Sequence, residues 1–112
     1  MHDLKQKLRE FAEARDWEQF HSPKNLAMAL SVETAELLEH FQWLTQEQSY
    51  VEDPDKREKV RQEIGDILIY LVRLADKLGI DPLAAARDKM AINERKYPAS
   101  LSRGNARKYD DL

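Results

Sequence analysis

Three signals for the start of a helix divide this chain and constrain its fold more than any other feature. Ser22-Pro23, Asp53-Pro54 and Asp81-Pro82 each place a capping side chain directly before a proline. A Ser or Asp in this position accepts a hydrogen bond from the first helical turn, and proline suits that turn because its missing N–H is not needed there. Gly79 is a natural helix end before the last signal. The sequence therefore predicts helices that begin at residues 23, 54 and 82.

A further helix is predicted at the N-terminus, with Asp3 as its cap, while Tyr97-Pro98 ends the last helix. Within the third predicted helix, residues 67–72 are apolar on nearly all sides, so we expect it to be the central and most buried one. Residues 16–21 and 45–53 break the helical pattern and are predicted as loops. The second predicted helix has an apolar stripe made of Leu26, Leu30, Leu37, Phe41 and Leu44.

The composition fits one helical domain. Of 112 residues, 35% are charged and 42% are hydrophobic, a balance that suits a helical protein better than a β-sandwich or a disordered chain. We expect an all-α, four-helix-type bundle over residues 1–98, followed by a basic tail over residues 99–112. Because small helical proteins often gain core by assembling, the bundle is expected to be oligomeric.

Several classes of function are disfavoured by composition. The absence of cysteine excludes disulfides, thiol catalysis and cysteine-based zinc sites. The net charge of −3 argues against binding to a nucleic-acid polymer, which normally requires a basic surface. The longest uncharged apolar run, residues 67–72, is too short to span a bilayer, and the N-terminus lacks the apolar core of a secretory signal. We therefore expect a cytoplasmic protein with no membrane partner.

Two acidic pairs suggest where the function lies. Glu33 and Glu36 are three residues apart in one predicted helix, and Glu63 and Asp66 have the same spacing in another. Residues at this spacing share a helix face, and both pairs lie at the edge of an apolar stripe rather than on the opposite, solvated face. One such pair is common in a highly charged chain, whereas two on adjacent helices indicate an oxygen-rich site for a hard divalent cation.

The ligand types narrow the choice of metal. Di-iron bundles use Glu-x-x-His pairs, but here His40 follows Glu36 by four residues. The all-oxygen ligand set therefore favours Mg²⁺, with Mn²⁺ as the other option, over iron or zinc. Mg²⁺ held by carboxylates typically serves phosphate chemistry, in which it neutralises phosphoryl oxygens.

Aromatic and basic residues suggest what accompanies the phosphates. Trp17 lies in a loop and Trp43 near a helix end, and either indole could stack on a nucleobase or simply cover the rim of the core. Tyr70, one turn beyond Asp66, could bind a sugar or phosphate or cap the core. Lys89 and Asn93 could face phosphates or belong to a solvated helix face.

The residues also resemble a known family, the all-α NTP pyrophosphatases of the MazG-like superfamily, and most closely its dCTP pyrophosphatase branch. The resemblance covers essentially the whole chain, and the paired acids are shared across the superfamily. The matching segments are residues 15–21, Asn25-Leu26, Glu33-x-x-Glu36-Leu37, Phe41-Gln-Trp43, Glu63-x-x-Asp66 through Val72, Lys89-Met90, Asn93, Tyr97-Pro98, residues 102–104 and Lys108-Tyr109.

The resemblance implies an enzyme that hydrolyses a nucleoside triphosphate between the α- and β-phosphates, giving a monophosphate and pyrophosphate, as in sanitation of the nucleotide pool. It further implies a homotetramer, a dimer of dimers, with sites completed across subunits. The implied metal ligands for Mg²⁺ are Glu33, Glu36, Glu63 and Asp66. The implied base and sugar contacts are Trp17, Glu18, Gln19, Phe20, His21, Trp43 and Tyr70, with Lys89 and Asn93 near the phosphates.

Within this site, Glu36 and Glu63 are the candidate catalytic residues, and Glu36 is expected to orient the attacking water. The chain departs from the family at Leu8, where close relatives carry a histidine that touches the substrate. The favoured substrate is dCTP or a modified dCTP. The alternatives are the same chemistry on dUTP or on a broad range of NTPs, and a non-catalytic helical assembly module.

Overall fold

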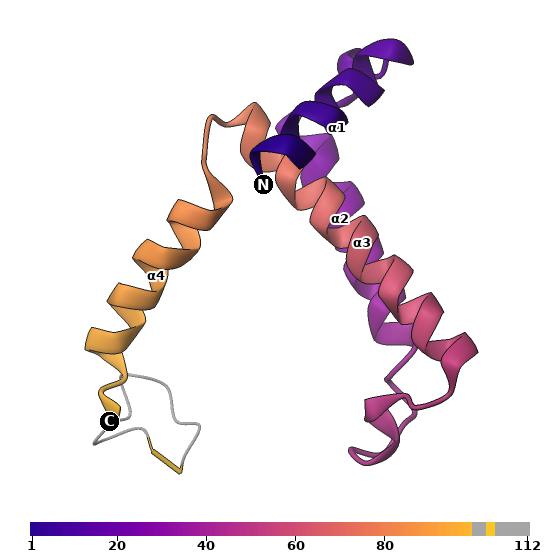
Figure 1. Ribbon diagram of the computed structural model, residues 1–112, viewed down its shortest axis with the longest axis vertical. Coiled ribbons are helices and arrows are strands. Elements are labelled where there is room, and N and C mark those ends of the chain that lie inside the picture. Colours follow the sequence, from indigo (N-terminus) through magenta and orange to yellow (C-terminus); the bar gives the residue numbers. More distant parts are fainter. Residues whose placement is uncertain (100–102, 105–112) are drawn as a thin grey trace. The chain divides into compact units, whose positions relative to one another are not determined.

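The computed structural model describes residues 1–99, 103 and 104, and within them the secondary structure is helical (Figure 1). This confirms the all-α fold class. The predicted basic tail lies, apart from residues 99, 103 and 104, outside the described residues. The α-helices are α1 (His2–Ala14), α2 (Pro23–Glu39), α3 (Pro54–Lys77) and α4 (Pro82–Lys96), with short 3-10 turns η1 (Glu18–Phe20) and η2 (Gln48–Tyr50).

The three predicted capping signals are confirmed. The Ser22 hydroxyl accepts a hydrogen bond from the Asn25 backbone N–H at 3.1 Å. The Asp53 carboxylate accepts from the N–H of Lys56, also at 3.1 Å, and Asp81 accepts from two N–H groups at the start of α4. Each cap contributes about 1 kcal/mol to helix stability. Gly79 follows α3 with φ of +67°, a left-handed conformation that only glycine adopts without strain.

Two predicted helix boundaries were wrong. Helix α1 begins at His2, one residue before the predicted cap Asp3, which lies in the first turn where its charge favours the positive end of the helix dipole. Helix α2 ends at Glu39, before Phe41 and Leu44 of the predicted stripe. There the backbone tightens into turns, because the N–H groups of residues 40 and 41 bond to carbonyl groups three residues earlier.

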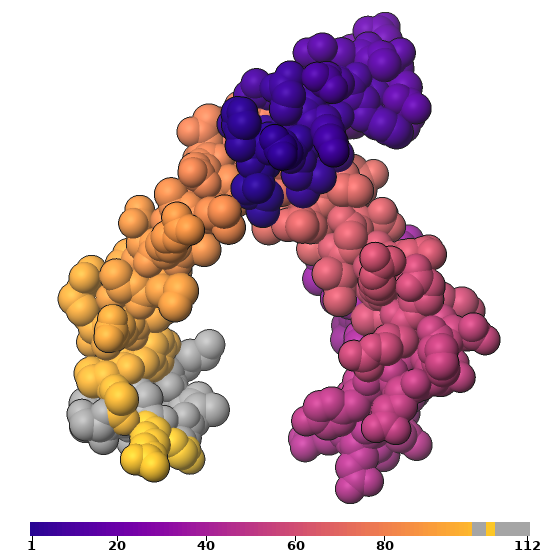
Figure 2. Space-filling model, viewed as in Figure 1, coloured from indigo at the N-terminus to yellow at the C-terminus, as the bar shows by residue number. Residues whose placement is uncertain are grey.

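The first compact unit of the chain runs from Met1 to Gly79, and the second begins at Ile80. In the first unit α2 and α3 lie side by side and α1, indigo in Figure 2, packs against α3 (Figures 1 and 2). The core contains Ala12, Leu26 and Val72. The predicted domain limits of 1–98 and 99–112 stay a prediction. In the part of the chain that the structure describes, no helix has the length and apolar character needed to cross a bilayer.

The apolar run of α3 is less buried than predicted. Helix α3 contacts both α1 and α2 and is central in that sense. However, Leu68, Ile69 and Leu71 remain 38%, 37% and 41% exposed. The reason is that two neighbouring helices cover only part of the circumference of α3 within one chain.

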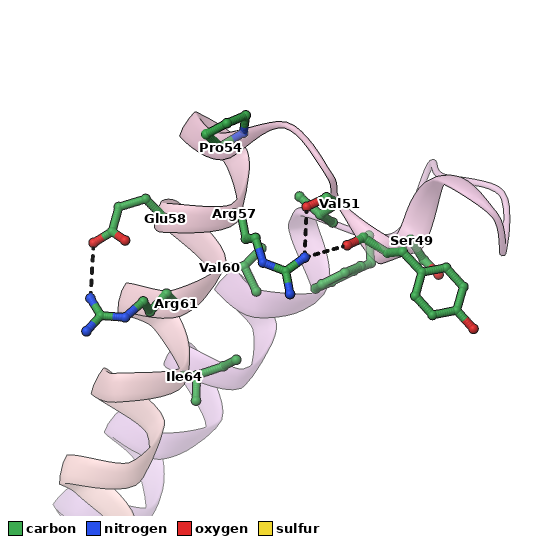
Figure 3. Close-up of a pocket in the computed structure, with 10 residues that line it drawn as sticks. Ser49, Val51, Pro54, Arg57, Glu58, Val60, Arg61 and Ile64 are labelled. Carbon is green, nitrogen blue, oxygen red and sulfur yellow. Dashed lines mark hydrogen bonds and ion pairs between the residues drawn. The ribbon is translucent and has the colours of Figure 1, made fainter.

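The turn between α2 and α3 is tied to α3 by Arg57. Its guanidinium donates to the carbonyl oxygens of Tyr50, at 3.0 Å, and Val51, at 3.3 Å (Figure 3). Val51 has a left-handed φ of +47°, which is strained for a β-branched residue. A pocket of about 540 Å³ lies against this turn, and its labelled lining residues are Ser49, Val51, Pro54, Arg57, Glu58, Val60, Arg61 and Ile64 (Figure 3). Arg57 therefore has a structural role, holding the turn on α3.

Candidate metal centre and nucleotide site

Three of the four predicted metal ligands converge between α2 and α3. Glu33 and Glu36 lie one turn apart on α2, and Glu63 lies on the adjacent helix α3. Each offers a carboxylate oxygen, and these oxygens lie within 4.8 Å of one another. All three residues are half-buried, as the placement of the acids at the edge of the apolar stripes predicted. The two helices thus bring acids 30 residues apart in the sequence into one cluster.

Two oxygens of this cluster lack the hydrogen bonds that buried polar atoms normally have. Oε2 of Glu33 and Oε2 of Glu63 are buried and have no hydrogen-bond partner among the residues that the structure describes. A buried, unsatisfied carboxylate oxygen is costly. Neighbouring carboxylates cannot relieve that cost while they are ionised, because an ionised carboxylate only accepts hydrogen bonds. The cluster therefore requires either a proton or a cation.

The titration of Glu33 reflects this arrangement. Burial, followed by hydrogen bonds with Glu36 and Glu63 and by the charges of Glu36 and Asp66, raises the pKa of Glu33 to about 7. The protonated form is favoured because it is neutral and can donate to a neighbouring carboxylate. The raised pKa of Glu33 thus reflects how closely the carboxylates of the cluster approach one another in a partly buried site.

The cluster fits a divalent cation. Its donors are all hard carboxylate oxygens, the ligand type that Mg²⁺ and Mn²⁺ prefer. A cation would also satisfy the two buried oxygens that lack a donor. Asp66, the fourth predicted ligand, is exposed and lies outside the group of three, although its charge acts on Glu33.

The face of α3 that carries Glu63 continues well beyond the acids. Glu63, Asp66, Tyr70, Arg73 and Lys77 follow one another at alternating spacings of three and four residues, so they form one strip along the helix. Glu63 and Arg73 are separated by about 15 Å along the helix axis. The strip is acidic at one end and basic at the other, with Tyr70 between them.

The basic end of the strip holds the predicted substrate-binding segment 17–21. Arg73 donates to Oε1 of Glu18 at 2.6 Å and to Nδ1 of His21 at 3.3 Å. Lys77 donates to Oε2 of Glu18. The hydrogen bond from Lys77, and then that from Arg73, hold the pKa of Glu18 below its ordinary value. Burial, and then the charge of Arg73, lower the pKa of His21. Both oxygens of Glu18 are therefore engaged by cations of α3.

The other residues of segment 17–21 differ in their contacts with the protein and in their exposure to solvent. Trp17 contacts the edge of Phe11 with ring centroids 5.6 Å apart and lies 6.1 Å from the ring of His21, yet it remains 42% exposed. Gln19 donates to the backbone and side-chain oxygens of Asp16, each at 3.0 Å. Phe20 is 59% exposed. Two aromatic faces are thus presented to solvent from a segment fixed to the protein.

The remaining predicted site residues are exposed or lie in the second unit. Trp43 lies in the turn after α2 and is 86% exposed, so it is not a covered rim residue in the single chain. Tyr70 is half-buried on α3. Lys89 and Asn93 are exposed residues of α4, in the second unit.

A group of charged residues around Arg73 was missed by the sequence analysis. Arg73 is 3% exposed, and its Nε has no hydrogen-bond partner within the described part of the chain. Asp76, beside it, accepts two hydrogen bonds from Arg9 of α1, at 2.5 and 2.7 Å. The sequence does contain a signal for this group. Continuing the spacing of three and four residues beyond Tyr70 places Arg73 and Lys77 on the same face of the helix as Glu63.

The chain is similar in sequence and in fold to known pyrophosphatases. The chain is 45% identical to dCTP pyrophosphatase 1 of Homo sapiens and 46% identical to that of Bos taurus, each over 114 aligned positions. These alignments cover all of this chain and 67% and 68% of those proteins. The fold matches the crystal structure of a pyrophosphatase from Archaeoglobus fulgidus with a TM-score of 0.82 and 45% identity, over 88% of this chain and 92% of that one. Residues 28–112 match the MazG-like family, and the chain belongs to that family.

Proposed function

We propose that this chain is a Mg²⁺-dependent pyrophosphohydrolase that cleaves dCTP, or a modified dCTP, to the monophosphate and pyrophosphate. The relatives named dCTP pyrophosphatase 1 align with the whole chain, which supports both the reaction and the nucleotide. A role in sanitation of the nucleotide pool follows from that reaction.

The observation that carries this proposal is the carboxylate cluster. Glu33, Glu36 and Glu63 bring three oxygens within 4.8 Å of one another, and Oε2 of Glu33 and Oε2 of Glu63 are buried without a donor. Bringing these carboxylates together costs free energy because of their charge, and binding of a cation would explain why the cluster exists. Mg²⁺ suits both the ligand set and a triphosphate substrate. Asp66, one turn from Glu63, would complete the ligand set from the solvent side.

The reaction requires an activated water and a stabilised leaving group. A bound divalent cation would neutralise negative charge on the phosphate oxygens. A carboxylate oxygen of Glu36 would accept a hydrogen bond from the attacking water and take its proton as the oxygen adds to the α-phosphorus. The bond from the α-phosphorus to the bridging oxygen breaks, so the products are the monophosphate, pyrophosphate and one proton. Glu63 would keep the cluster anionic around this centre.

The aromatic and polar residues of the first unit would bind the nucleoside. Trp17, Phe20 and Trp43 have exposed rings on which a base can stack. Tyr70 lies on α3 between the acids and segment 17–21, where its hydroxyl suits a sugar. The residues assigned to the phosphates are Lys89 and Asn93 of α4. Leu8 on α1, a position where the resemblance implies a histidine that touches the substrate, would shift the preference among bases or sugars.

The enzyme would assemble as a homotetramer, a dimer of dimers, in the cytoplasm. Exposed apolar side chains on α2 and α3 support assembly, since they remain uncovered in one chain. Sites completed across subunits would then bring further residues to each carboxylate cluster.

The proposal is tested by measuring pyrophosphate release with Mg²⁺ from dCTP, dUTP, methylated and oxidised deoxynucleotides and the ribonucleotides. We expect dCTP or a modified dCTP to have the highest kcat/KM. Preference for dUTP or equal rates on many nucleotides would keep the reaction and replace the substrate. No release from any of them, by a folded protein with Mg²⁺, would reject the enzyme and favour a helical assembly module.

A further inference from the structure

Arg73 is a charged side chain in the core of the first unit. It is 3% exposed, whereas Arg residues are rarely buried unless they are paired. Its Nη2 donates to Glu18 at 2.6 Å and to His21 at 3.3 Å, and its Nη1 lies 3.6 Å from Asp76. It thus links α3 to segment 17–21, more than 50 residues away in the sequence.

Segment 17–21 is also bonded to α2. The side-chain amide of Asn25 donates to the carbonyl oxygen of Phe20 at 3.0 Å. Gln19 closes the turn at Asp16, whose φ of +55° is left-handed. The segment therefore has a defined conformation, and Arg73 and Lys77 attach it ionically to α3.

Glu18 is the residue through which this attachment acts. Its Oε1 is bonded to Arg73 and its Oε2 to Lys77, so both oxygens face cations of the protein. A carboxylate whose two oxygens both accept hydrogen bonds from the protein is poorly placed to accept one from the edge of a base as well. By contrast, the rings on either side of it, Trp17 and Phe20, remain 42% and 59% exposed.

We propose that Arg73 is a positioning residue for the nucleoside. By holding Glu18 and His21 on α3, it fixes the rings of Trp17 and Phe20 in the orientation in which they contact the base. Glu18 acts through Arg73 and does not contact the substrate. This inference rests on the proposed function, because it takes segment 17–21 as part of the nucleotide site.

The position of Arg73 on α3 supports this role. Arg73 and Glu63 lie on the same strip of α3, about 15 Å apart along the axis. A nucleoside triphosphate also has two separated ends, with phosphates at one and a base at the other. A defect in Arg73 should therefore act on the base end and leave the carboxylate cluster unchanged.

The test compares steady-state kinetics of Arg73→Met, Arg73→Lys and the unmodified protein on dCTP. Methionine fills the space of the buried stem without a charge. We expect Arg73→Met to raise KM about tenfold while kcat stays within about threefold. Affinity for Mg²⁺ in the absence of nucleotide should be unchanged by calorimetry. Arg73→Lys keeps the charge but loses the planar guanidinium group, so its KM should lie between those of Arg73→Met and the unmodified protein.

A double-mutant cycle tests the link to Glu18. Glu18→Gln alone should also raise KM, because it weakens the pairs of Glu18 with both Arg73 and Lys77. Because the Arg73 pair is common to both variants, the two increases in KM should be clearly less than multiplicative when Glu18→Gln is combined with Arg73→Met. If the two effects multiply, Glu18 contacts the substrate independently and the positioning role is wrong. Because the Glu18 side chain is 36% exposed, Glu18→Gln remains informative even if Arg73→Met fails to fold.

The matched control is Arg61→Met on the same helix. Arg61 is 79% exposed and pairs with exposed Glu58, so its loss should leave KM and kcat unchanged. An unchanged KM in folded Arg73→Met, with an active unmodified protein, would overturn the positioning role and leave the proposed function in place. Pyrophosphate release from no nucleotide by the unmodified protein would instead overturn the proposed function itself.

Discussion

At the scale of single residues, Glu63 shows how a position in the fold gives a common side chain a particular chemistry. Glutamate on a helix surface is ordinary, but Oε2 of Glu63 is buried without a donor beside Glu33 and Glu36. Binding of a cation, as we propose for this cluster, would offset the free energy cost of that arrangement. Exposed Glu58, five residues earlier on α3, has the same chemistry without that environment.

We predict that Glu63→Gln lowers kcat at least about a hundredfold, because it removes one anionic ligand and leaves a weaker amide oxygen in its place. The measurement is Mg²⁺-dependent pyrophosphate release, with circular dichroism to establish that the helices are intact. Glu58→Gln is the control and should retain full activity. Retained activity in a natively folded Glu63→Gln would show that the cluster is not the catalytic centre.

We predict that Trp43→Ala raises KM about tenfold with little change in kcat, because stacking on a base contributes about 1–3 kcal/mol and does not change the chemical step. Trp43 is 86% exposed, so its removal creates no cavity in the single chain. Trp43→Phe should restore most of the affinity. A loss confined to kcat would show that Trp43 is not a stacking platform.

At the scale of elements, α3 connects the functional and structural parts of the first unit. One of its faces carries Glu63 of the carboxylate cluster, then Asp66, Tyr70 and Arg73. Next to Arg73, Asp76 accepts the two hydrogen bonds that attach α1 through Arg9. The hydrogen bonds and the charge of Arg9 hold the pKa of Asp76 below its ordinary value. The same segment of α3 thus attaches both α1 and segment 17–21.

The depressed pKa of Asp76 predicts how this attachment depends on pH. The folded state favours the ionised form of the Asp76 carboxyl group more than the unfolded state does. The resulting stabilisation is fully present above the pKa of Asp76 in the unfolded chain, about 4. It is lost as the pH falls through the lower pKa of Asp76 in the folded protein. Asp76→Asn should therefore be less stable than the unmodified protein at pH 7, and the difference should shrink below about pH 4.

Urea denaturation at pH 7, 5 and 3 measures this difference in the free energy of unfolding. Asp88→Asn, at an exposed position of α4, is the control and should track the unmodified protein. A difference that is constant over this pH range would show that Asp76 stabilises the fold without its charge.

The elements also show which features can be read from sequence. The caps at Ser22, Asp53 and Asp81 were predicted because each interaction spans at most three residues. The two acidic pairs were predicted because helix periodicity places both members of a pair on the same face of their own helix. The pairing of Arg73 with Glu18 spans 55 residues and depends on how segment 17–21 folds back, which no local pattern encodes. Likewise, the exposure of residues 67–72 depends on which surfaces pack together.

At the scale of the whole molecule, the single chain leaves apolar surface uncovered. The large apolar residues of α2 and α3 that are more than half exposed are Met28, Val32, Leu38 and Ile64. Burial of such surface drives association at about 25 cal/mol per Å² before the entropic cost of assembly is subtracted.

We predict that the chain sediments as a tetramer, and that Leu38→Lys shifts it toward smaller species, because a charge must then be desolvated at the interface. Lys59→Glu, an exposed polar position on α3, is the control. Sedimentation velocity over a range of concentrations distinguishes the species. A monomer at all concentrations would reject the tetramer.

The contacts of α1 have a consequence for motion. Within the described part of the chain, Ala12 is the one residue of α1 that is buried. Helix α1 is otherwise held by the ion pair of Arg9 with Asp76 and by the contact of Phe11 with Trp17, at the start of segment 17–21. Elements with little buried surface open first in native-state fluctuations. We therefore predict that the amide hydrogens of α1 exchange with solvent faster than those around Val72. Because Trp17 contacts Phe11, each opening of α1 would also free the Trp17 side chain. The opening rate of the N-terminal helix would therefore limit how long segment 17–21 keeps its conformation.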